Sequence, residues 1–156
     1  MPEITTPLAH IDDTKALLNI ALAAFAHSVE KYGQLPQGMD QLDKHRSAIK
    51  TGLYHKVEHD GELVGGILLS VQSETQMCIE VFFVHPEAQG KQIGSAVLDQ
   101  IESMYSHVTT WTLVTPDREY RNHHFYEKHG YTKVGAFSPD PERDFTLFQY
   151  EKTIGS

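Results

Sequence analysis

The sequence has one cysteine, Cys78, among its 156 residues. One cysteine excludes an intramolecular disulfide framework and is typical of a reducing compartment, so we expect a cytoplasmic location. No stretch reaches the roughly 20 apolar residues that a membrane-spanning helix requires, so we expect no membrane partner. Because Cys78 falls in an apolar run, we expect it to pack in the core, and a nucleophilic role is the less favoured alternative.

Basic residues are also scarce. The chain has 13 lysines and arginines against 21 aspartates and glutamates, which gives a formal net charge of −8. This charge disfavours a nucleic-acid partner, because the phosphate backbone would be repelled, and favours a cationic substrate such as an amine. The length, with 40% hydrophobic and 22% charged residues, is typical of a globular domain, so we expect residues 1–156 to form a single domain.

Motifs for metal binding are missing as well. The chain has 10 histidines, and His123, His124 and His129 cluster, but neither HExxH nor a paired CxxC accompanies them. Adjacent residues point about 100° apart on a helix, so His123 and His124 cannot both face one ion. We therefore expect no metal cofactor.

The segment from Cys78 to Tyr105 carries the most informative pattern in the chain. Residues 79–84 are apolar, β-branched or aromatic except for Glu80, which predicts a largely buried strand. The pair His85-Pro86 ends this strand, because proline cannot donate to a sheet ladder. A loop follows and leads into a helix, whose predicted apolar face consists of Ile93, Val97, Ile101 and Met104.

The loop between this strand and this helix predicts an anion-binding site. It contains Gly90 and Gly94 and leads into a helix whose first-turn amides and positive dipole end point at one place. Nucleotide signatures do not fit, because Gly90-Lys91 is followed by Gln92 rather than by serine or threonine, and the loop has no GxGxxG. We expect another phosphate-bearing ligand, and the alternative is an ordinary strand–helix turn.

The rest of the chain predicts helices and strands in mixed order. Asp60-Gly61 is typical of a β-hairpin turn, and Gly65-Gly66 indicates a bulge or a close backbone approach. The other expected helices span residues 12–31, 40–50 and 122–129, and the other expected strands span residues 1–8, 53–58, 63–71, 109–115, 131–137 and 144–151. The order β-α-α-β-β-β-α-β-α-β-β predicts a mixed α/β or α+β domain with a mixed sheet.

Two motifs resemble those of the GNAT N-acetyltransferase family. The first is the family's acyl-CoA-binding segment, a hydrophobic strand ending in valine, then a Pro-Glu pair and a glycine-bearing loop. It is matched here by Val84, Pro86-Glu87, Gln89, Ile93 and Gly94. The second, residues 122–131, resembles the family's asparagine, aromatic-tyrosine and glycine-aromatic segment. The resemblance covers about Ala16 to Lys152 and implies the GNAT acyl-CoA N-acyltransferase fold.

The resemblance implies acetyl-CoA as the co-substrate. In the family, loop amides hold the pyrophosphate and the exposed strand backbone pairs with the pantetheine arm. The implied CoA-binding residues are Phe82, Phe83 and Val84 in the strand, Gln89, Gly90, Lys91, Gln92, Ile93, Gly94 and Ser95 in the loop, and Asn122 and Phe125. Gln92 departs from the family, which usually has glycine there. A side chain at this position would crowd the pyrophosphate, or would cost about 1–2 kcal/mol if φ must be positive.

The resemblance also implies an acid for acetyl transfer. Tyr126 stands where many relatives keep a tyrosine that protonates the leaving thiolate, and a phenol with an ordinary pKa of about 10 suits this role. The alternative is that Tyr126 only packs its ring in the core.

Two residues are candidates for the general base. Glu80 lies in an apolar strand, where a carboxylate is costly unless it is partnered or used, so it is either the base or a member of a structural pair. His85 is a weaker candidate, since a neutral imidazole also accepts a proton. The expected catalytic residues are Tyr126 and Glu80.

The expected function is acetyl transfer from acetyl-CoA to a primary amine of a small molecule or a peptide. Homodimers are common in the family, so the resemblance also allows a homodimer. One alternative is a non-catalytic acyl-CoA-binding or sensor protein of the same fold, which the departure at Gln92 keeps open. The other is an unrelated α/β nucleotide-binding protein.

Overall fold

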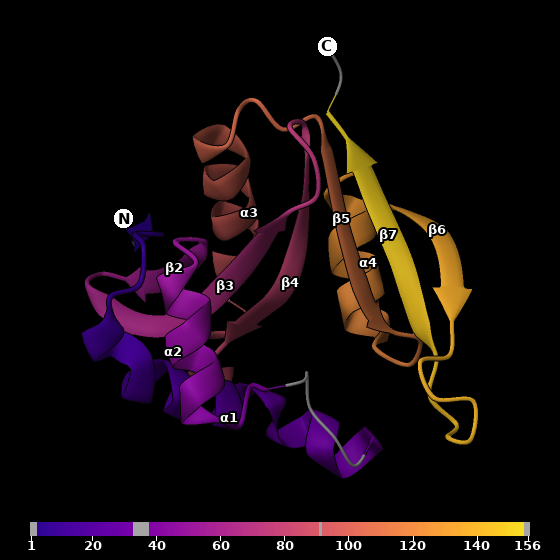
Figure 1. Cartoon of the computed structure of the whole chain (residues 1–156), viewed down its shortest axis with the longest axis horizontal. Coiled ribbons are helices and arrows are strands. Elements are labelled where there is room, and N and C mark those ends of the chain that lie inside the picture. Colours follow the sequence, from indigo (N-terminus) through magenta and orange to yellow (C-terminus); the bar gives the residue numbers. More distant parts are fainter. Residues whose placement is uncertain (1–2, 33–37, 91, 155–156) are drawn as a thin grey trace. The chain divides into compact units, whose positions relative to one another are not determined.

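The computed structural model describes residues 3–32, 38–90 and 92–154 (Figure 1). The helices are α1 (Thr14–Tyr32), α2 (Leu42–Lys50), α3 (Ile93–Met104) and α4 (Tyr120–Lys128), with short 3-10 turns η1 (Ile11–Asp13) and η2 (Pro86–Ala88). The strands are β1 (Ile4–Thr5), β2 (Tyr54–His59), β3 (Glu62–Val71), β4 (Gln76–Val84), β5 (Thr110–Pro116), β6 (Thr132–Phe137) and β7 (Leu147–Thr153). The predicted order of elements is confirmed.

The strands form a seven-stranded mixed sheet in the order β1-β2-β3-β4-β5-β7-β6. Strands β4 and β5 run parallel, whereas β1–β2, β2–β3, β5–β7 and β6–β7 pair antiparallel. A parallel pair needs a crossover connection, and α3 supplies it between β4 and β5. The mixed α/β class predicted from the sequence is therefore confirmed.

The chain divides into two compact units. The first comprises Met1–Leu69 and Val81–Tyr105, and the second comprises Ser70–Glu80 and Ser106–Ser156. Strand β4 contributes its last four residues to the first unit and its earlier residues to the second. The single domain expected for residues 1–156 stays a prediction.

The first unit is built on an apolar core beneath α1 and α2. The core cluster consists of Leu17, Ala21, Met39, Ala48, Ile49, Tyr54 and Phe83. The ring of Phe83 lies 5.8 Å from that of Phe25 on α1, centroid to centroid. This packing fixes the last part of β4 by its side chains.

The hairpin between β2 and β3 has the predicted turn. Asp60 and Gly61 both have positive φ, 53° and 85°, which is the combination that a type I′ turn requires. Glycine adopts this conformation freely, and aspartate tolerates it better than most residues. The Asp-Gly prediction is confirmed.

The glycine pair in β3 lies next to a bulge and at a close backbone approach, the two features predicted there. The β2–β3 register shifts between Val57 and Glu58, so β3 carries an extra residue there. A Cβ on Gly65 would lie 2.2 Å from the backbone oxygen of Phe83, and one on Gly66 would lie 2.8 Å from the ring of Phe83. Strand β4 can therefore lie against β3 here only because both positions lack a side chain.

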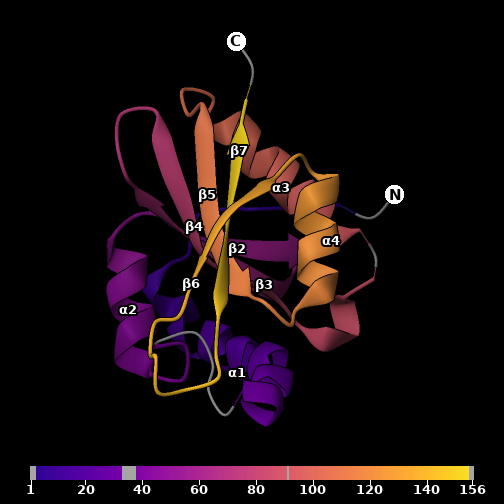
Figure 2. The ribbon, with the colours of Figure 1, turned by 90° about the vertical axis from the view of Figure 1, so that its right-hand side faces the viewer.

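In the second unit, α4 lies against one side of β5 and β7 (Figures 1 and 2). Strands β5 and β7 pair from Thr110↔Thr153 to Pro116↔Leu147. On the side that faces α4, Trp111 and Tyr150 are almost fully buried, and the ring of His123 from α4 lies 5.9 Å from that of Tyr150. The helix thus covers an aromatic face of the sheet.

One predicted core residue is exposed. Ile93, Val97 and Ile101 of α3 are buried as expected, but Met104 is 49% exposed. The helix ends at Met104, and the next residue, Tyr105, contacts His55 in its place. The prediction for Met104 was wrong, because periodicity alone does not reveal where a helix passes beyond its partner.

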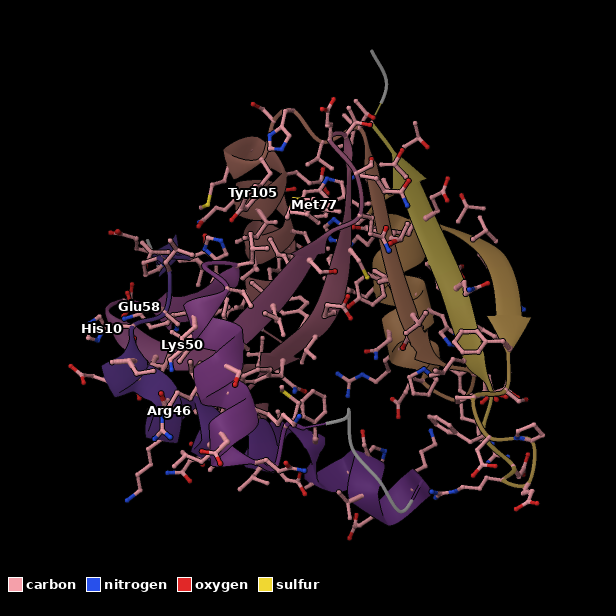
Figure 3. All side chains as sticks on the ribbon, viewed as in Figure 1. His10, Arg46, Lys50, Glu58, Met77 and Tyr105 are labelled. Atoms are coloured by element: carbon pink, nitrogen blue, oxygen red, sulfur yellow. The ribbon has the colours of Figure 1, made fainter. Side chains whose placement is uncertain are left out.

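Two buried histidines in the first unit are held in defined tautomers. His45 Nε2 donates to the Met39 carbonyl at 2.8 Å, so its Nδ1 accepts from the Tyr54 hydroxyl at 2.9 Å. His55 Nδ1 lies 2.8 Å from the Thr6 carbonyl and its Nε2 lies 2.7 Å from the hydroxyl of Tyr105, which Figure 3 labels beside the end of α3. Burial lowers the pKa of both histidines, so both are neutral near pH 7.

No helix within residues 3–32, 38–90 and 92–154 is both long and apolar enough to cross a membrane.

Acidification is expected to destabilise the protein through His45 and His55. Because the folded state lowers the pKa of both, the unfolded chain binds more protons below the ordinary value of about 6.5. Each histidine then costs up to about 1.4 kcal/mol of unfolding free energy per pH unit, until the lowered folded pKa is reached. Urea denaturation between about pH 7 and pH 5 measures this loss.

The His55→Gln variant should lose less stability over this range than the wild type, whereas His27→Gln, at an exposed site on α1, should follow the wild type. Equal slopes for all three proteins would contradict the assignment.

Gly65→Ala is expected to lower the free energy of unfolding by about 1–3 kcal/mol, because the new Cβ meets the rigid backbone of β4. The matched control is Gly135→Ala, whose Cβ would meet only the flexible end of the Gln149 side chain. The control should change stability by no more than about 0.5 kcal/mol in the same urea titration. An equally large loss in the control would contradict the proposed backbone contact.

Candidate functional site

The residues of β4 whose backbone groups bond β3 are even-numbered near the start of the strand and odd-numbered near its end. Near its start, the Gln76 carbonyl accepts from Gln72, on the β3 side, and the preceding Thr75 carbonyl accepts from Thr109, on the β5 side. Near its end, the amide of His85 donates to Val64 of β3. In the first part of β4, the backbone N–H and C=O groups of even-numbered residues therefore point toward β3, whereas at its end those of odd-numbered residues do. This change requires one extra residue, a bulge, in between.

The bulge decides toward which neighbouring strand the backbone groups at the end of β4 point. Because His85 faces β3, the N–H and C=O groups of Phe83 face β3 as well. Those of Phe82 and Val84 face the opposite edge. The β5 ladder along that edge runs only from Gln76 to Ile79. The family resemblance implied that the backbone of Phe82, Phe83 and Val84 pairs with CoA. In the structure, the backbone of Phe83 faces β3 instead.

The loop after β4 is stabilised by its own side chains. Gln89 Nε2 donates to the carbonyl of Val84 at 2.9 Å, which draws the loop back over the end of the strand. Gly90 has φ of 83°, and a Cβ there would meet nothing within 4 Å. Lys91, expected to contact CoA, lies outside the described residues.

Gln92 is in the left-handed conformation, with φ of 59°. This is the strained conformation that its position predicted for a family glycine, and it costs a non-glycine residue about 1–2 kcal/mol. Gln92 is also the N-cap of α3, yet its side chain makes no cap hydrogen bond. The residue therefore turns the chain into the helix without satisfying the helix amides.

The N-terminus of α3 is suited to an anion. The first turn contains no acidic residue, and a helix whose N-cap side chain does not bond its amides presents them to a ligand. Ile93 is 2% exposed and anchors this turn in the core. The turn is thus fixed by burial on one side, while its backbone offers the donors that a pyrophosphate needs.

Glu80 is the exposed residue of β4, a strand that was predicted to be largely buried. The Ser70 hydroxyl donates to its Oε1 at 2.5 Å, a length typical of a hydroxyl bound to a charged carboxylate. Both roles considered for Glu80, the base and a member of a structural pair, are compatible with this environment, because an exposed carboxylate can accept a proton and this one is also bonded to Ser70. Its hydrogen-bond partner on the neighbouring strand is a serine.

His85 is less suited to act as a base than the sequence suggested. Its Nδ1 accepts a hydrogen bond from the amide of Glu87 at 3.1 Å, which caps the turn η2. In the neutral ring the proton then sits on Nε2, so neither nitrogen is left to accept a proton from a substrate. His85 is better explained as the residue that ends β4.

Helix α4 is tied to the sheet of the second unit by polar bonds. Asn122 Nδ2 donates to Thr115 Oγ1 at 3.2 Å, and His123 Nε2 donates to the Pro116 carbonyl at 2.8 Å. At the other end of the helix, the Tyr150 hydroxyl donates to Glu127 Oε2 at 2.9 Å, and this carboxylate helps raise the pKa of Tyr150, after burial, to about 12. These bonds set the rotation of α4, and with it the positions of the residues it carries.

Tyr126 is the buried residue of α4. It is 8% exposed, and its ring lies 5.1 Å from that of Phe125 and 5.5 Å from that of Tyr131. Burial raises its pKa above the ordinary value of a phenol, so the hydroxyl keeps its proton near neutral pH. Both roles considered for Tyr126, ring packing and proton donation, are compatible with this environment.

The described residues contain no group of three or more histidine, cysteine, aspartate or glutamate side chains placed to hold a metal ion. His123 bonds a backbone carbonyl instead. Cys78 is half-buried, and burial raises the pKa of its thiol to about 11, so it stays protonated and is not activated as a nucleophile.

Sequence reasoning missed Ser70 and His123. Ser70 is an unremarkable strand residue until the hairpin register is known. Counting from the Gln72–Gln76 bond places Ser70 opposite Cys78 and diagonal to Glu80, which is a signal that the hairpin itself contains. His123 was weighed only as a metal ligand, and its contact with Pro116 depends on how α4 docks on the sheet.

Comparison with known proteins agrees with this geometry. Residues 50–133 match the family described as the acetyltransferase (GNAT) domain. The chain is 30% identical over 131 residues to the uncharacterized protein YrkN of Bacillus subtilis (strain 168), a match that covers 80% of this chain and 70% of YrkN.

Solved structures share the fold. The PaiA N-acetyltransferase of Thermoplasma acidophilum, in complex with coenzyme A, has a TM-score of 0.79 at 18% identity and covers 97% of this chain and 99% of its own. The ribosomal-protein-S18-alanine N-acetyltransferase of Escherichia coli has a TM-score of 0.76 at 16% identity, with 100% of this chain and 96% of its own covered. Together with the family match over more than half of its length, these findings show that the chain belongs to the GNAT acetyltransferase family.

Proposed function

We propose that the protein transfers the acetyl group of acetyl-CoA to a primary amine of a small molecule or a peptide, by direct attack of the amine. The observation that carries this proposal is the run from β4 to α3. The backbone groups of Phe82 and Val84 turn to the edge of β4, and the chain then enters the uncapped N-terminus of α3 through the left-handed Gln92. A strand edge followed by a helix N-terminus suits a ligand with amide groups at one end and a pyrophosphate at the other.

The residues present fit this co-substrate. The backbone of Phe82 and Val84 would pair with the pantetheine arm. The amides of Gly90 and of residues 92–95 would hold the pyrophosphate, with Gln89 fixing the loop. Asn122 and Phe125, on α4, are proposed as further CoA contacts on the strength of the sequence motif that contains them. Acetyl-CoA supplies the acetyl group as a thioester.

Two side chains of the second unit would handle protons. Glu80 would take a proton from the acceptor amine, because it is an exposed carboxylate on a rigid strand. Tyr126 would give its proton to the departing sulfur, because burial keeps its phenol protonated at neutral pH. The amine must be neutral to attack, so a nearby carboxylate serves the reaction better than a cation would.

The net charge of the protein favours one class of acceptor amine. A formal net charge of −8 favours an acceptor that arrives as a cation. The second candidate function is binding of acyl-CoA without turnover. Gln92 favours this candidate, because its side chain stands at a position where the pyrophosphate would approach.

Tyr126→Phe and Glu80→Gln are each expected to lower kcat by about 10²-fold, because each removes a proton-transfer group while keeping the side chain's size. The measurement is thiol release from acetyl-CoA in the presence of a panel of primary amines and short peptides. Calorimetry should find acetyl-CoA binding unchanged in Glu80→Gln. If both variants keep kcat within about twofold of the wild type, neither assigned role holds.

Gln92→Gly is expected to stabilise the protein by roughly 1 kcal/mol and to tighten acetyl-CoA binding, because it removes both the left-handed strain and the side chain. Calorimetric titration with acetyl-CoA, with ATP and NAD as controls, measures the affinity. The matched control is Asp60→Gly, which also removes a residue of positive φ but lies in the β2–β3 turn. Binding of ATP but not acetyl-CoA by the wild type would contradict the proposed function.

A further inference from the structure

The carboxylate of Glu80 accepts a short hydrogen bond from a neighbouring strand, although Glu80 itself is exposed. Ser70 Oγ donates to Glu80 Oε1 at 2.5 Å. An exposed glutamate normally samples several rotamers, and fixing it costs side-chain entropy. A charge-assisted bond to a neighbouring strand is strong enough to select one of these rotamers.

The serine that makes this bond stands on a rigid part of the sheet. On the β3 side, the hairpin is closed by the bond from the Gln72 amide to the Gln76 carbonyl, and on the other side β4 pairs with β5 from Gln76 to Ile79. Backbone bonds on both sides restrict β4 at the residues that precede Glu80. The position of Ser70 relative to Glu80 is therefore set by the sheet rather than by a loop.

The neighbouring side chains form a continuous polar row. Gln72 Oε1 accepts from Gln76 Nε2 at 2.7 Å and from Thr112 Oγ1 at 3.0 Å. Cys78, between this pair and Glu80 along β4, interacts with Ser70, Thr112 and Glu80, and it stays a protonated thiol because burial raises its pKa to about 11. The carboxylate thus faces donors from two strands, which leaves it oriented but still able to accept a proton.

We propose that Ser70 is a positioning residue for acetyl transfer. Its hydroxyl fixes the carboxylate of Glu80 in the orientation that receives the proton of the acceptor amine. As the N–H bond of the amine breaks, that proton passes to Glu80, whereas Ser70 keeps its own proton and only donates a hydrogen bond. This inference rests on the proposed function, in which Glu80 is the base.

The test compares Ser70→Ala, which removes the hydroxyl, with Ser70→Thr, which keeps it. Ser70→Ala should lower kcat by about 10-fold and leave KM for acetyl-CoA within about twofold of the wild type, because only the orientation of the base is lost. Ser70→Thr should restore kcat. The matched control is Ser73→Ala, which makes the same chemical change in the turn between β3 and β4, where the hydroxyl bonds the Thr75 amide.

A second readout does not depend on turnover. The side-chain carboxyl resonance of Glu80, assigned by its loss in Glu80→Gln, should move in Ser70→Ala and return in Ser70→Thr when the protein is labelled with ¹³C-glutamate. An unmoved resonance in Ser70→Ala would overturn the proposal.

The outcomes separate this proposal from the one on which it rests. If Glu80→Gln slows the reaction but Ser70→Ala does not, Ser70 has no positioning role and the acetyltransferase assignment stands. Equal losses in kcat and in acetyl-CoA binding would point to general damage and would also overturn the proposal. A wild-type protein that acetylates no amine overturns the proposed function, and the role of Ser70 with it.

Discussion

The need of each backbone N–H and C=O group for a partner is the constraint on which this structure depends most. Strand β4 meets it in two ways. Up to Ile79 it bonds β3 on one edge and β5 on the other, and at its end it bonds β3 through His85 and, by alternation, through Phe83. The backbone groups of Phe82 and Val84 face the other edge, where the Val84 carbonyl accepts from Gln89 and where we propose that the amides of a ligand pair. A bulge of one residue is enough to make this change of direction.

Glycine makes this arrangement of β4 possible. Gly65 and Gly66 let β3 lie against the Phe83 backbone and ring, so that the end of β4 is fixed against β3. Beyond the strand, Gln92 takes a conformation that glycine would adopt at no cost. Backbone shape, more than side-chain chemistry, therefore forms the proposed CoA-binding segment.

The histidines of this chain show how composition alone can mislead. Ten histidines raise the question of a metal site, yet His45, His55 and His123 each bond a backbone carbonyl. Each fastens one element to another: α2 to the core, β2 to the N-terminal segment, and α4 to β5. A histidine can use both ring nitrogens within a packed interior, and this gives it a structural role that a sequence count does not reveal.

The sequence by itself determined the order of the elements, the Asp60-Gly61 turn, the strand–loop–helix segment around Gly90 and the family. These rest on local signals, since periodicity, turn residues and motif spacing act within a few residues of one another. Only the tertiary structure decided that Glu80 is exposed and bonded to Ser70, that Phe83 turns its backbone to β3, and that Met104 is exposed on α3. The first two depend on register and on a bulge, because in a strand a shift of one residue moves every later side chain to the opposite face. The third depends on where α3 passes beyond the elements it packs on.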